Sequence, residues 1–297
     1  MAINMRKISI VITAFSLLAA VLGFMLRDAV LTAAFDPISG LAIPGERTTT
    51  LLIALTVAVA AAACVVGALV SAGYEKPRAA ARYAEGGADG GATDCLSPGT
   101  AGMTAENAAP ATISPFTLVA LVAGGVVWLA GAAASLVASY PAAVAGSYSN
   151  MIFSALSALS ALSVIYLARG AYVGRSGGFD RFLSVIPPLF FSYWLILLYM
   201  ANASNPVVLM YGYECLAVAS AAMCFYFLSG CLYGKAEPGK TVFCMIMTVF
   251  LCGAISADGF TLPERLMIGS ALLIALANIA PFIRGLVQKT GKKERTA

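Results

Sequence analysis

The stretch TTTLLIALTVAVAAAACVVGALVSAGY, residues 48–74, decides the fold class because it holds 27 consecutive residues without a charged side chain. Roughly 20 helical residues cross a bilayer core about 30 Å thick, so this stretch is long enough to span it. Further charge-free stretches occupy residues 8–26, 107–168, 182–213, 215–234, 241–257 and 266–283. Because backbone groups in lipid must satisfy one another, these stretches predict helices rather than open sheet.

Two of these stretches contain more than one span. Residues 107–168 form a run of 62, which breaks where turn residues collect at Tyr140-Pro141 and at Gly146-Ser147. Residues 182–213 break between Ala201 and Pro206. The sequence therefore predicts an all-α integral membrane protein, a polytopic bundle of eight transmembrane helices at about residues 8–26, 50–73, 116–139, 149–168, 182–201, 206–233, 241–256 and 266–284.

The composition supports this class and excludes others. Apolar residues make up 60% of the 297 residues, charged residues make up 11%, and the mean hydropathy is +0.89. A soluble domain has roughly 25% charged residues, so a soluble enzyme and a disordered chain are both excluded. Histidine, the commonest general base and metal ligand, is absent.

The sequence predicts no enzyme, no cofactor and no metal site. Nucleophile-elbow, zinc-protease, calcium-loop and dinucleotide-binding motifs do not occur in it. Six of its seven cysteines lie in predicted spans, and no C-x-x-C occurs. These cysteines are therefore expected to be small apolar side chains rather than disulfides or zinc ligands.

The distribution of basic residues predicts the orientation. With the N-terminus in the cytoplasm, the outer loops hold three basic residues, Arg27, Arg47 and Arg265. The cytoplasmic segments hold the other fifteen, which are Arg6, Lys7, Lys76, Arg78, Arg82, Arg169, Arg175, Arg181, Lys235, Lys240, Arg284, Lys289, Lys292, Lys293 and Arg295. Every cytoplasmic loop agrees with the positive-inside rule, so both termini are expected to be cytoplasmic.

One long polar segment divides the chain. Residues 75–115 are rich in Ala and Gly and hold few large apolar side chains, so they predict a flexible cytoplasmic linker. It separates a two-helix membrane unit, residues 1–74, from a six-helix unit, residues 116–285, which precedes a basic tail, residues 286–297. The linker is interpreted as a spacer or as a docking segment for a soluble partner. The first span is expected to be a retained anchor, since it is too long for a typical signal peptide.

Glu214 is interpreted as the only ionisable residue deep in a span. It lies eight residues after Pro206, about 12 Å along a helix, and Tyr211 shares its face. Asn202 and Asn205 lie at the outer mouth of the same hairpin, so the group predicts a polar crevice that opens outward. Glu214 is a candidate proton or cation site. The alternatives are a protonated Glu that bonds a neighbouring helix, or an interfacial Glu.

Proline residues mark candidate bends. Pro187 and Pro188 fall one turn into the fifth predicted helix, where they predict a kink or a late helix start. Pro281 lies near the inner end of the eighth. Paired kinks at these positions are interpreted as possible gates or as ordinary bends.

A serine repeat runs along the fourth predicted helix, from Ser154 to Ser163. The third predicted helix offers matching small residues, which are Gly124, Gly125, Gly131 and Ser135. Small residues let helices approach closely, so tight packing of these two helices is preferred over a serine-lined pore.

Residues 234–241 match the phosphate-loop pattern G-x-x-x-x-G-K-[ST]. A phosphate loop follows a strand in a soluble α/β domain, whereas helices flank this match, and Pro238 removes an amide donor. We interpret it as a tight cytoplasmic turn and expect no nucleotide.

The leading hypothesis for function is a transporter or permease-like protein for a small solute. The alternative is a non-transporting membrane scaffold or sensor whose linker docks a partner. The net charge of +4 follows from the cytoplasmic lysines and arginines and does not indicate nucleic acid. The arrangement resembles the small polytopic proteins of bacterial inner membranes, so the expected location is the cytoplasmic membrane.

Overall fold

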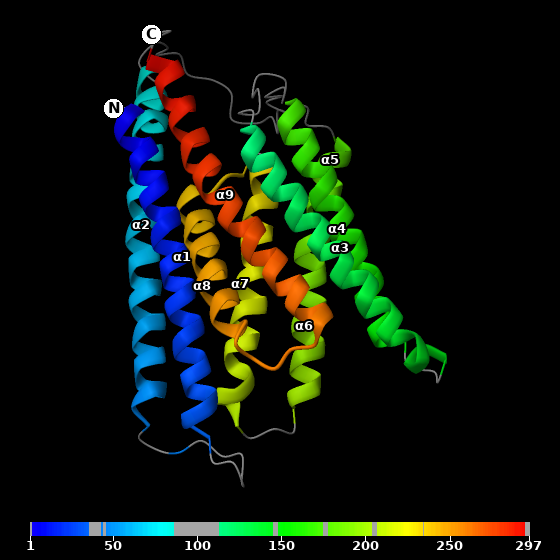
Figure 1. The fold of residues 1–297 in the computed structure, drawn as a ribbon. Coiled ribbons are helices and arrows are strands. Elements are labelled where there is room, and N and C mark those ends of the chain that lie inside the picture. The colour runs from blue at the N-terminus through cyan, green and yellow to red at the C-terminus, as the bar shows by residue number, and fades with distance from the viewer. Residues whose placement is uncertain are drawn as a thin grey trace, which may run out of the picture.

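The computed structural model describes residues 2–35, 43, 46–85, 113–144, 148–174, 178–203, 207–233 and 235–294. Within that part of the chain, nine helices form a bundle (Figure 1). They are α1 (Ala2–Ala33), α2 (Arg47–Glu85), α3 (Pro115–Val144), α4 (Ser149–Val173), α5 (Gly178–Ser184), α6 (Ile186–Asn202), α7 (Val208–Leu232), α8 (Pro238–Ile255) and α9 (Leu262–Glu294). The start of α1 and the end of α9 lie at the same end of the bundle (Figure 1).

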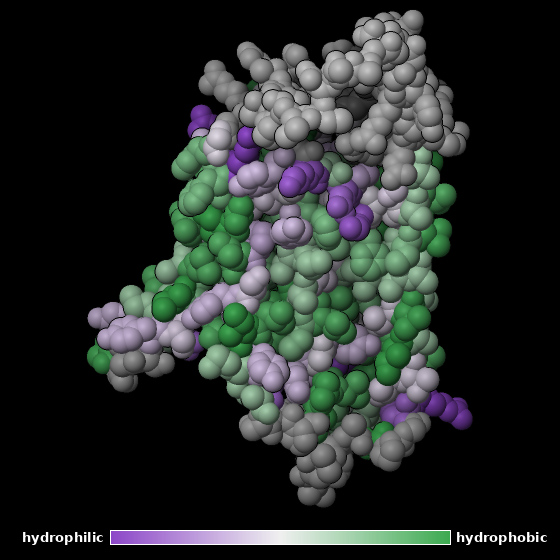
Figure 2. All heavy atoms as spheres, turned by 180° about the vertical axis from the view of Figure 1, so that it is seen from behind, coloured by the Kyte–Doolittle hydropathy of each residue, from purple (hydrophilic) through white to green (hydrophobic). Residues whose placement is uncertain are grey.

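Eight helical spans are long and apolar enough to cross a membrane. The helices α5 and α6 together form one of them, Gly178–Asn202. Figure 2 shows hydrophobic residues over the middle of one face and the most hydrophilic residues towards its two ends. The predicted all-α class and the predicted number of spans are therefore confirmed for the described residues.

Helix α8 lies at the centre of the bundle. It packs against α1, α2, α7 and α9, and 83% of its span is buried, against 17% of the span in α2. A helix that is hydrophobic on all sides belongs inside a bundle rather than at its surface. These four helices therefore pack around α8.

Glycines let α1 and α2 approach α8 closely. A Cβ atom on Gly253 of α8 would lie 2.6 Å from the Cβ of Ala20 in α1. A Cβ atom on Gly67 of α2 would lie 2.7 Å from the carbonyl oxygen of Gly239 in α8. Both distances are shorter than real side chains allow. Because lipid supplies no hydrophobic force between helices, close packing of this kind is what holds them together.

The predicted two-helix and six-helix membrane units share one core in the described residues. Both α1 and α2 pack on α8, and α1 also packs on α9. The close contact of Ala20 with Gly253 explains this, since the first helix meets its tightest partner more than 200 residues later in the chain.

Two helices continue past the boundaries expected from the sequence. Helix α2 reaches Glu85, beyond the expected limit at 74, and α9 reaches Glu294, beyond the expected limit at 285. The extension of α2 contains Ala, Arg, Lys and Glu, and the extension of α9 contains Gln, Lys and Glu, all of which are good helix formers. Residues 86–112 of the predicted linker lie outside the described residues.

The predicted interruption at Pro187 and Pro188 is a break between two helices. Helix α5 ends at Ser184, a turn follows at Val185, and α6 begins at Ile186. Proline is tolerated in the first turn of a helix because its amide would have no partner there. Pro281, by contrast, lies inside α9, which continues beyond it.

Helix α3 packs against both α4 and α9. Gly125 faces Ile165 of α4, and the hydroxyls of Ser135 and Ser154 are 2.8 Å apart across the same interface. Gly124 and Gly131, which the sequence assigned to packing on α4, instead face side chains of α9. The reason is helical geometry: adjacent positions point about 100° apart, so Gly124 and Gly125 meet different neighbours.

We predict that Gly253→Ala destabilises the protein, because the new methyl group would collide with Ala20. Overpacking of this kind costs about 1–3 kcal/mol, which thermal unfolding in detergent measures. Gly269→Ala is the matched control, since nothing lies within 4 Å of that position. Equal unfolding temperatures for the two variants would contradict the close packing of α1 on α8.

Candidate functional site

The structure describes three of the four residues of the predicted outward crevice. Glu214 and Tyr211 lie in α7 and are half-buried. Asn202 ends α6, and its amide nitrogen donates a hydrogen bond to the carbonyl of Leu198 at 3.0 Å, within its own helix. Asn205 lies outside the described residues. A shared site of all four residues therefore stays a prediction.

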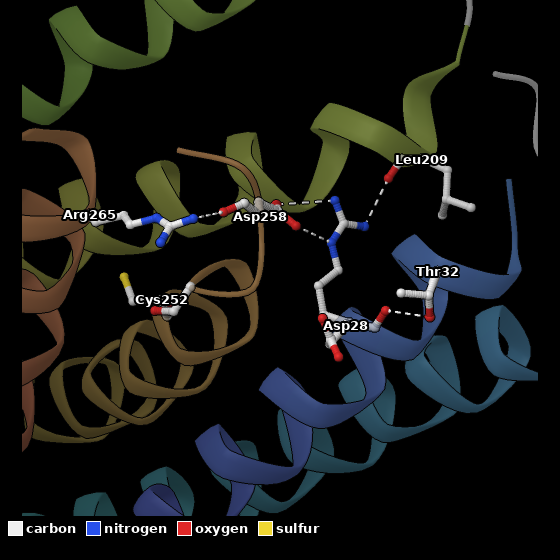
Figure 3. Close-up of polar contacts among 8 residues, drawn as sticks. Asp28, Thr32, Leu209, Cys252, Asp258 and Arg265 are labelled. Atoms are coloured by element: carbon white, nitrogen blue, oxygen red, sulfur yellow. Dashed lines mark hydrogen bonds and ion pairs between the residues drawn. The ribbon is translucent and has the colours of Figure 1, made fainter. Parts of the chain in front are cut away.

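A buried ion pair lies near Glu214. The Arg27 side chain is 0% exposed, and its Nε donates to Oδ1 of Asp258 at 2.7 Å. One terminal nitrogen of the guanidinium donates to the other Asp258 oxygen at 3.1 Å, and the other donates to the carbonyl of Leu209 at 3.1 Å (Figure 3). The pair joins α1 to the α8–α9 loop and to the first turn of α7.

Further contacts extend this cluster. The Cζ atom of Arg27 lies 5.2 Å from the centre of the Tyr213 ring, which is a cation–π distance. The Tyr213 hydroxyl is 3.1 Å from Oγ1 of Thr56 in α2. Arg265 donates to the backbone carbonyl of Asp258 at 3.4 Å. The cluster therefore ties α1, α2, α7 and α9 together at the end of the bundle opposite the termini.

The cluster brings two carboxyl groups, those of Asp258 and Glu214, near Arg27. Burial raises the pKa of Asp258 above its ordinary value, and the Arg27 guanidinium opposes that rise by its hydrogen bond and its charge. Glu214, next to Tyr213, lies within electrostatic reach of Arg27, Asp258 and Glu264. The buried Arg27 thus pairs with Asp258, while the Glu214 carboxyl group lies within electrostatic reach of both.

The interpretation of Glu214 as the only ionisable residue deep in a span is wrong. The sequence placed the end of the first helix at Leu26, whereas α1 continues to Ala33 and carries Arg27 within the span Ile8–Ala33. The boundary was thus placed seven residues too early, and Arg27, the first residue beyond it, was assigned to an outer loop. The sequence did contain one signal for a special role of Arg27. Basic residues are scarce in the predicted outer loops, which hold only three of them.

A cavity of about 220 Å³ lies in the other half of the bundle, between α3, α4, α5, α6, α7 and α9. Asn278 lines it and lies 13 residues after Arg265 in α9, which is about 20 Å along a helix. The cavity is therefore at the opposite end from the crevice that the sequence predicts. Pro187 lines it as well, and Pro281 follows Asn278 by one turn.

The lining of the cavity is apolar except at one side. Phe225 and Ile274 are typical of the apolar part. The polar side is made by Asp180, which is 8% exposed, by Ser184, Ser229 and by Asn278. The hydroxyls of Ser184 and Ser229 are 2.9 Å apart, and this bond joins α5 to α7. A few polar groups in an apolar pocket are typical of small-molecule sites.

Sequence reasoning did not identify the polar side of this cavity. Asp180 follows the basic loop after α4 and was not distinguished from other charged loop residues. It becomes buried because α5 folds back on α4 and α7 before the break at Val185. The one available signal was the position of Pro187, since the cavity forms beside the helix break.

An aromatic cluster borders the cavity. Trp128 is fully buried, and its Nε1 donates to the hydroxyl of Ser157 at 3.0 Å. The Trp128 ring lies 5.8 Å from that of Phe225, which lines the cavity. The cluster gives this wall a rigid surface.

The phosphate-loop match has a packing role at its second glycine. Gly239 lies in the first turn of α8, directly against Gly67 and Ser71 of α2. The backbone that would hold a phosphate is therefore in contact with another helix. Lys240 is exposed and pairs with Glu237 at 2.6 Å. This geometry supports the interpretation as a turn.

The described residues hold no group of three His, Cys, Asp or Glu side chains that could bind a metal ion. Comparisons of the chain with protein-family models, with curated proteins and with solved structures found no match. Any function must therefore be argued from the cluster and the cavity themselves.

We predict that Arg27→Met destabilises the protein strongly, because it leaves Asp258 buried without its partner. Breaking a buried ion pair costs about 3–5 kcal/mol, which thermal unfolding in detergent measures. The double variant Arg27→Met/Asp258→Leu removes both charges and is expected to recover most of this loss.

Asp28→Asn is the control for that series, since Asp28 is the neighbouring carboxylate and is exposed. It should unfold as the unmodified protein does. A double variant no more stable than Arg27→Met would show that packing, and not the unpaired charge, explains the loss.

Proposed function

We propose that the protein is a transporter for a small solute in the cytoplasmic membrane of a bacterial cell. The solute binds in the cavity lined by Asp180, Ser229 and Asn278. The cluster around Arg27 and Asp258 closes the opposite end of the path. The observation that carries this proposal is the cavity itself, which has a few polar groups on one side of an apolar pocket.

The distribution of charge supports the orientation in this proposal. The start of α1 and the end of α9 lie at one end of the bundle (Figure 1), and Arg169, near the end of α4, and Lys235, between α7 and α8, belong to that end. Arg27 and Arg265 lie at the other end, where few basic residues occur. The positive-inside rule then makes the end with the termini cytoplasmic, so the cavity lies in the inner half.

The two ends of the bundle differ in the way that alternating access requires. Transporters hold a substrate site that is reached from one side while the other side is closed. Here the cavity occupies the inner half, and a buried ion pair joins α1, α7 and the α8–α9 loop in the outer half. This arrangement corresponds to a state that faces the cytoplasm.

Glu214 and the prolines have defined parts in this proposal. Glu214 is the proton or cation site, because it shares the charged cluster with Asp258 and Arg27. A proton bound there removes the repulsion between the Glu214 and Asp258 carboxylates, which exceeds the attraction between Glu214 and Arg27, and so strengthens the outer closure. Pro187 lines the cavity, and Pro188 follows it in α6. Pro281 lies one turn after the lining residue Asn278 in α9. Bending at these prolines would widen the cavity.

The orientation gives a labelling prediction. Gly259→Cys, in the exposed loop between α8 and α9, should react with a membrane-impermeant maleimide in intact cells. Lys235→Cys, exposed between α7 and α8, should react only after permeabilisation. The two cysteines are introduced into a chain whose native cysteines are replaced by alanine. Reaction of both sites from the same side would overturn the proposed threading.

The cavity gives a transport prediction. Purified protein in liposomes is expected to take up at least one member of a radiolabelled panel of amines, amino acids, sugars and nucleosides. Ala171→Phe places a ring in the cavity and should reduce uptake to the level of empty liposomes. Ala155→Phe, on the exposed face of the same helix, is the matched control and should transport normally.

The variant Glu214→Gln, measured in the same liposomes, distinguishes a coupling role of Glu214 from a structural role. A coupling role predicts that uptake loses its dependence on an imposed pH gradient while the protein remains folded. Lower thermal stability with unchanged uptake would indicate a structural role instead. Absence of uptake for the whole panel would contradict the proposed function and favour a scaffold or a sensor.

A further inference from the structure

Arg284 is a half-buried cation near the end of the apolar span of α9. It is the next-to-last residue of the span Leu262–Gly285. Its Nε donates to the hydroxyl of Ser9 at 3.4 Å, and Ser9 in α1 is fully buried. This contact places the guanidinium at the junction of α1 and α9, at the end of the bundle where α1 starts (Figure 1).

Arg284 has no carboxylate partner among the described residues. Arg27 donates to both oxygens of Asp258, whereas Arg284 takes part in neither of the two ion pairs that the described residues form. A guanidinium has five N–H donors, and within the described part of the chain the contact with Ser9 uses only the donor on Nε. The two terminal nitrogens, which bind carboxylates and phosphates in a planar fork, therefore remain for another group.

The helix ends around Arg284 carry an excess of positive charge. The start of α1 and the ends of α2 and α9 pack together (Figure 1). These three ends hold three acidic residues, Glu75, Glu85 and Glu294. They hold nine basic residues, which are Arg6, Lys7, Lys76, Arg78, Arg82, Arg284, Lys289, Lys292 and Lys293. Such an excess attracts anions.

Apolar side chains flank Ser9 on the outside of α1. Ile8 is 44% exposed, Ile10 is 53% exposed and Val11 is 65% exposed. Acyl chains are as apolar as such side chains and pack against them in a membrane. An anion that carries acyl chains therefore matches this place better than a soluble anion does.

We infer that the junction of α1 and α9 binds an anionic phospholipid, with the lipid phosphate at the terminal nitrogens of Arg284 and an acyl chain against Ile8 and Val11. Phosphate oxygens accept both N–H groups of the guanidinium fork. Zwitterionic lipids also carry a phosphate, but the excess of basic residues on the three helix ends favours a lipid with net negative charge. The inference goes beyond transport and does not depend on it.

The test counts bound lipid on the purified full-length protein by native mass spectrometry in a non-ionic detergent. Phosphatidylglycerol and phosphatidylcholine with identical acyl chains are titrated separately. Phosphatidylglycerol should bind about fivefold or more tightly than phosphatidylcholine. Equal affinity for the two lipids would overturn the inference.

Arg284→Gln tests the assigned phosphate ligand. It should weaken phosphatidylglycerol binding by about fivefold. Arg169→Gln removes the same charge at an exposed position in α4 and should leave that affinity unchanged. An equal loss in the two variants would show diffuse attraction by net charge and would overturn the assigned site.

A second variant covers the case in which Arg284→Gln does not fold. Arg284→Lys keeps the charge but lacks the planar fork, so phosphatidylglycerol affinity should still fall. Unchanged affinity in this variant would overturn the role of the fork.

Soluble phosphate separates the two sources of the ligand group. Glycerol 3-phosphate, added in large excess, carries the phosphate without acyl chains and should not displace phosphatidylglycerol. Displacement would overturn the lipid site in favour of a site for a soluble phosphate ester. None of these measurements involves uptake, so a failure of the lipid site and a failure of the proposed transport are distinguishable.

Discussion

Close contact between backbones at the central helix is the constraint on which the rest of the structure depends. Helix α8 has almost no side free for lipid, because α1, α2, α7 and α9 pack around it. Gly253 and Gly239 remove the side chains that would keep α1 and α2 away. The bundle therefore has a shared core, although residues 86–114 separate its first two helices from the others in sequence. Within lipid, where burial of apolar surface gives no net gain, such contacts are what fix helix positions.

The buried ion pair follows from this packing. Because α1 crosses α8 at Ala20 and Gly253, its next two turns reach the loop after α8, and Arg27 meets Asp258. A charged pair away from water is stabilising only when its geometry is good and its remaining groups are satisfied. Two bonds to Asp258, one to the carbonyl of Leu209 and the ring of Tyr213 provide that geometry. The pair thus fixes α1 and α7 at the end of the bundle opposite the termini, while the cavity hollows the end near the termini.

The spans could be predicted from the sequence, whereas the charged cluster and the cavity could not. The length of a charge-free run is a property of each segment alone, and it predicted the eight helical spans that are long and apolar enough to cross a membrane. The pairing of Arg27 with Asp258 joins residues 231 positions apart, and no local pattern encodes it. Glu214 was identified because an acid within a charge-free run is visible locally. Asp180 was not recognised as a buried residue, because its burial depends on the contact of α5 with α4 and α7. Gly124 was assigned to the wrong interface, because the spacing of small residues does not say which helix a face contacts.

The break between α5 and α6 explains why the cavity forms where it does. In an uninterrupted helix from 178 to 202, α5 would continue the axis of α6. The turn at Val185 instead lets α5 pack against α4 and α7. That turn brings Asp180 and Ser184 towards Ser229. It also leaves unfilled volume beside Pro187, because proline cannot donate to the preceding turn and has a short side chain. The helix break just before Pro187 thus places Asp180 and Ser184 of α5 in the lining of the cavity, so the chemistry of the cavity is a consequence of local backbone structure.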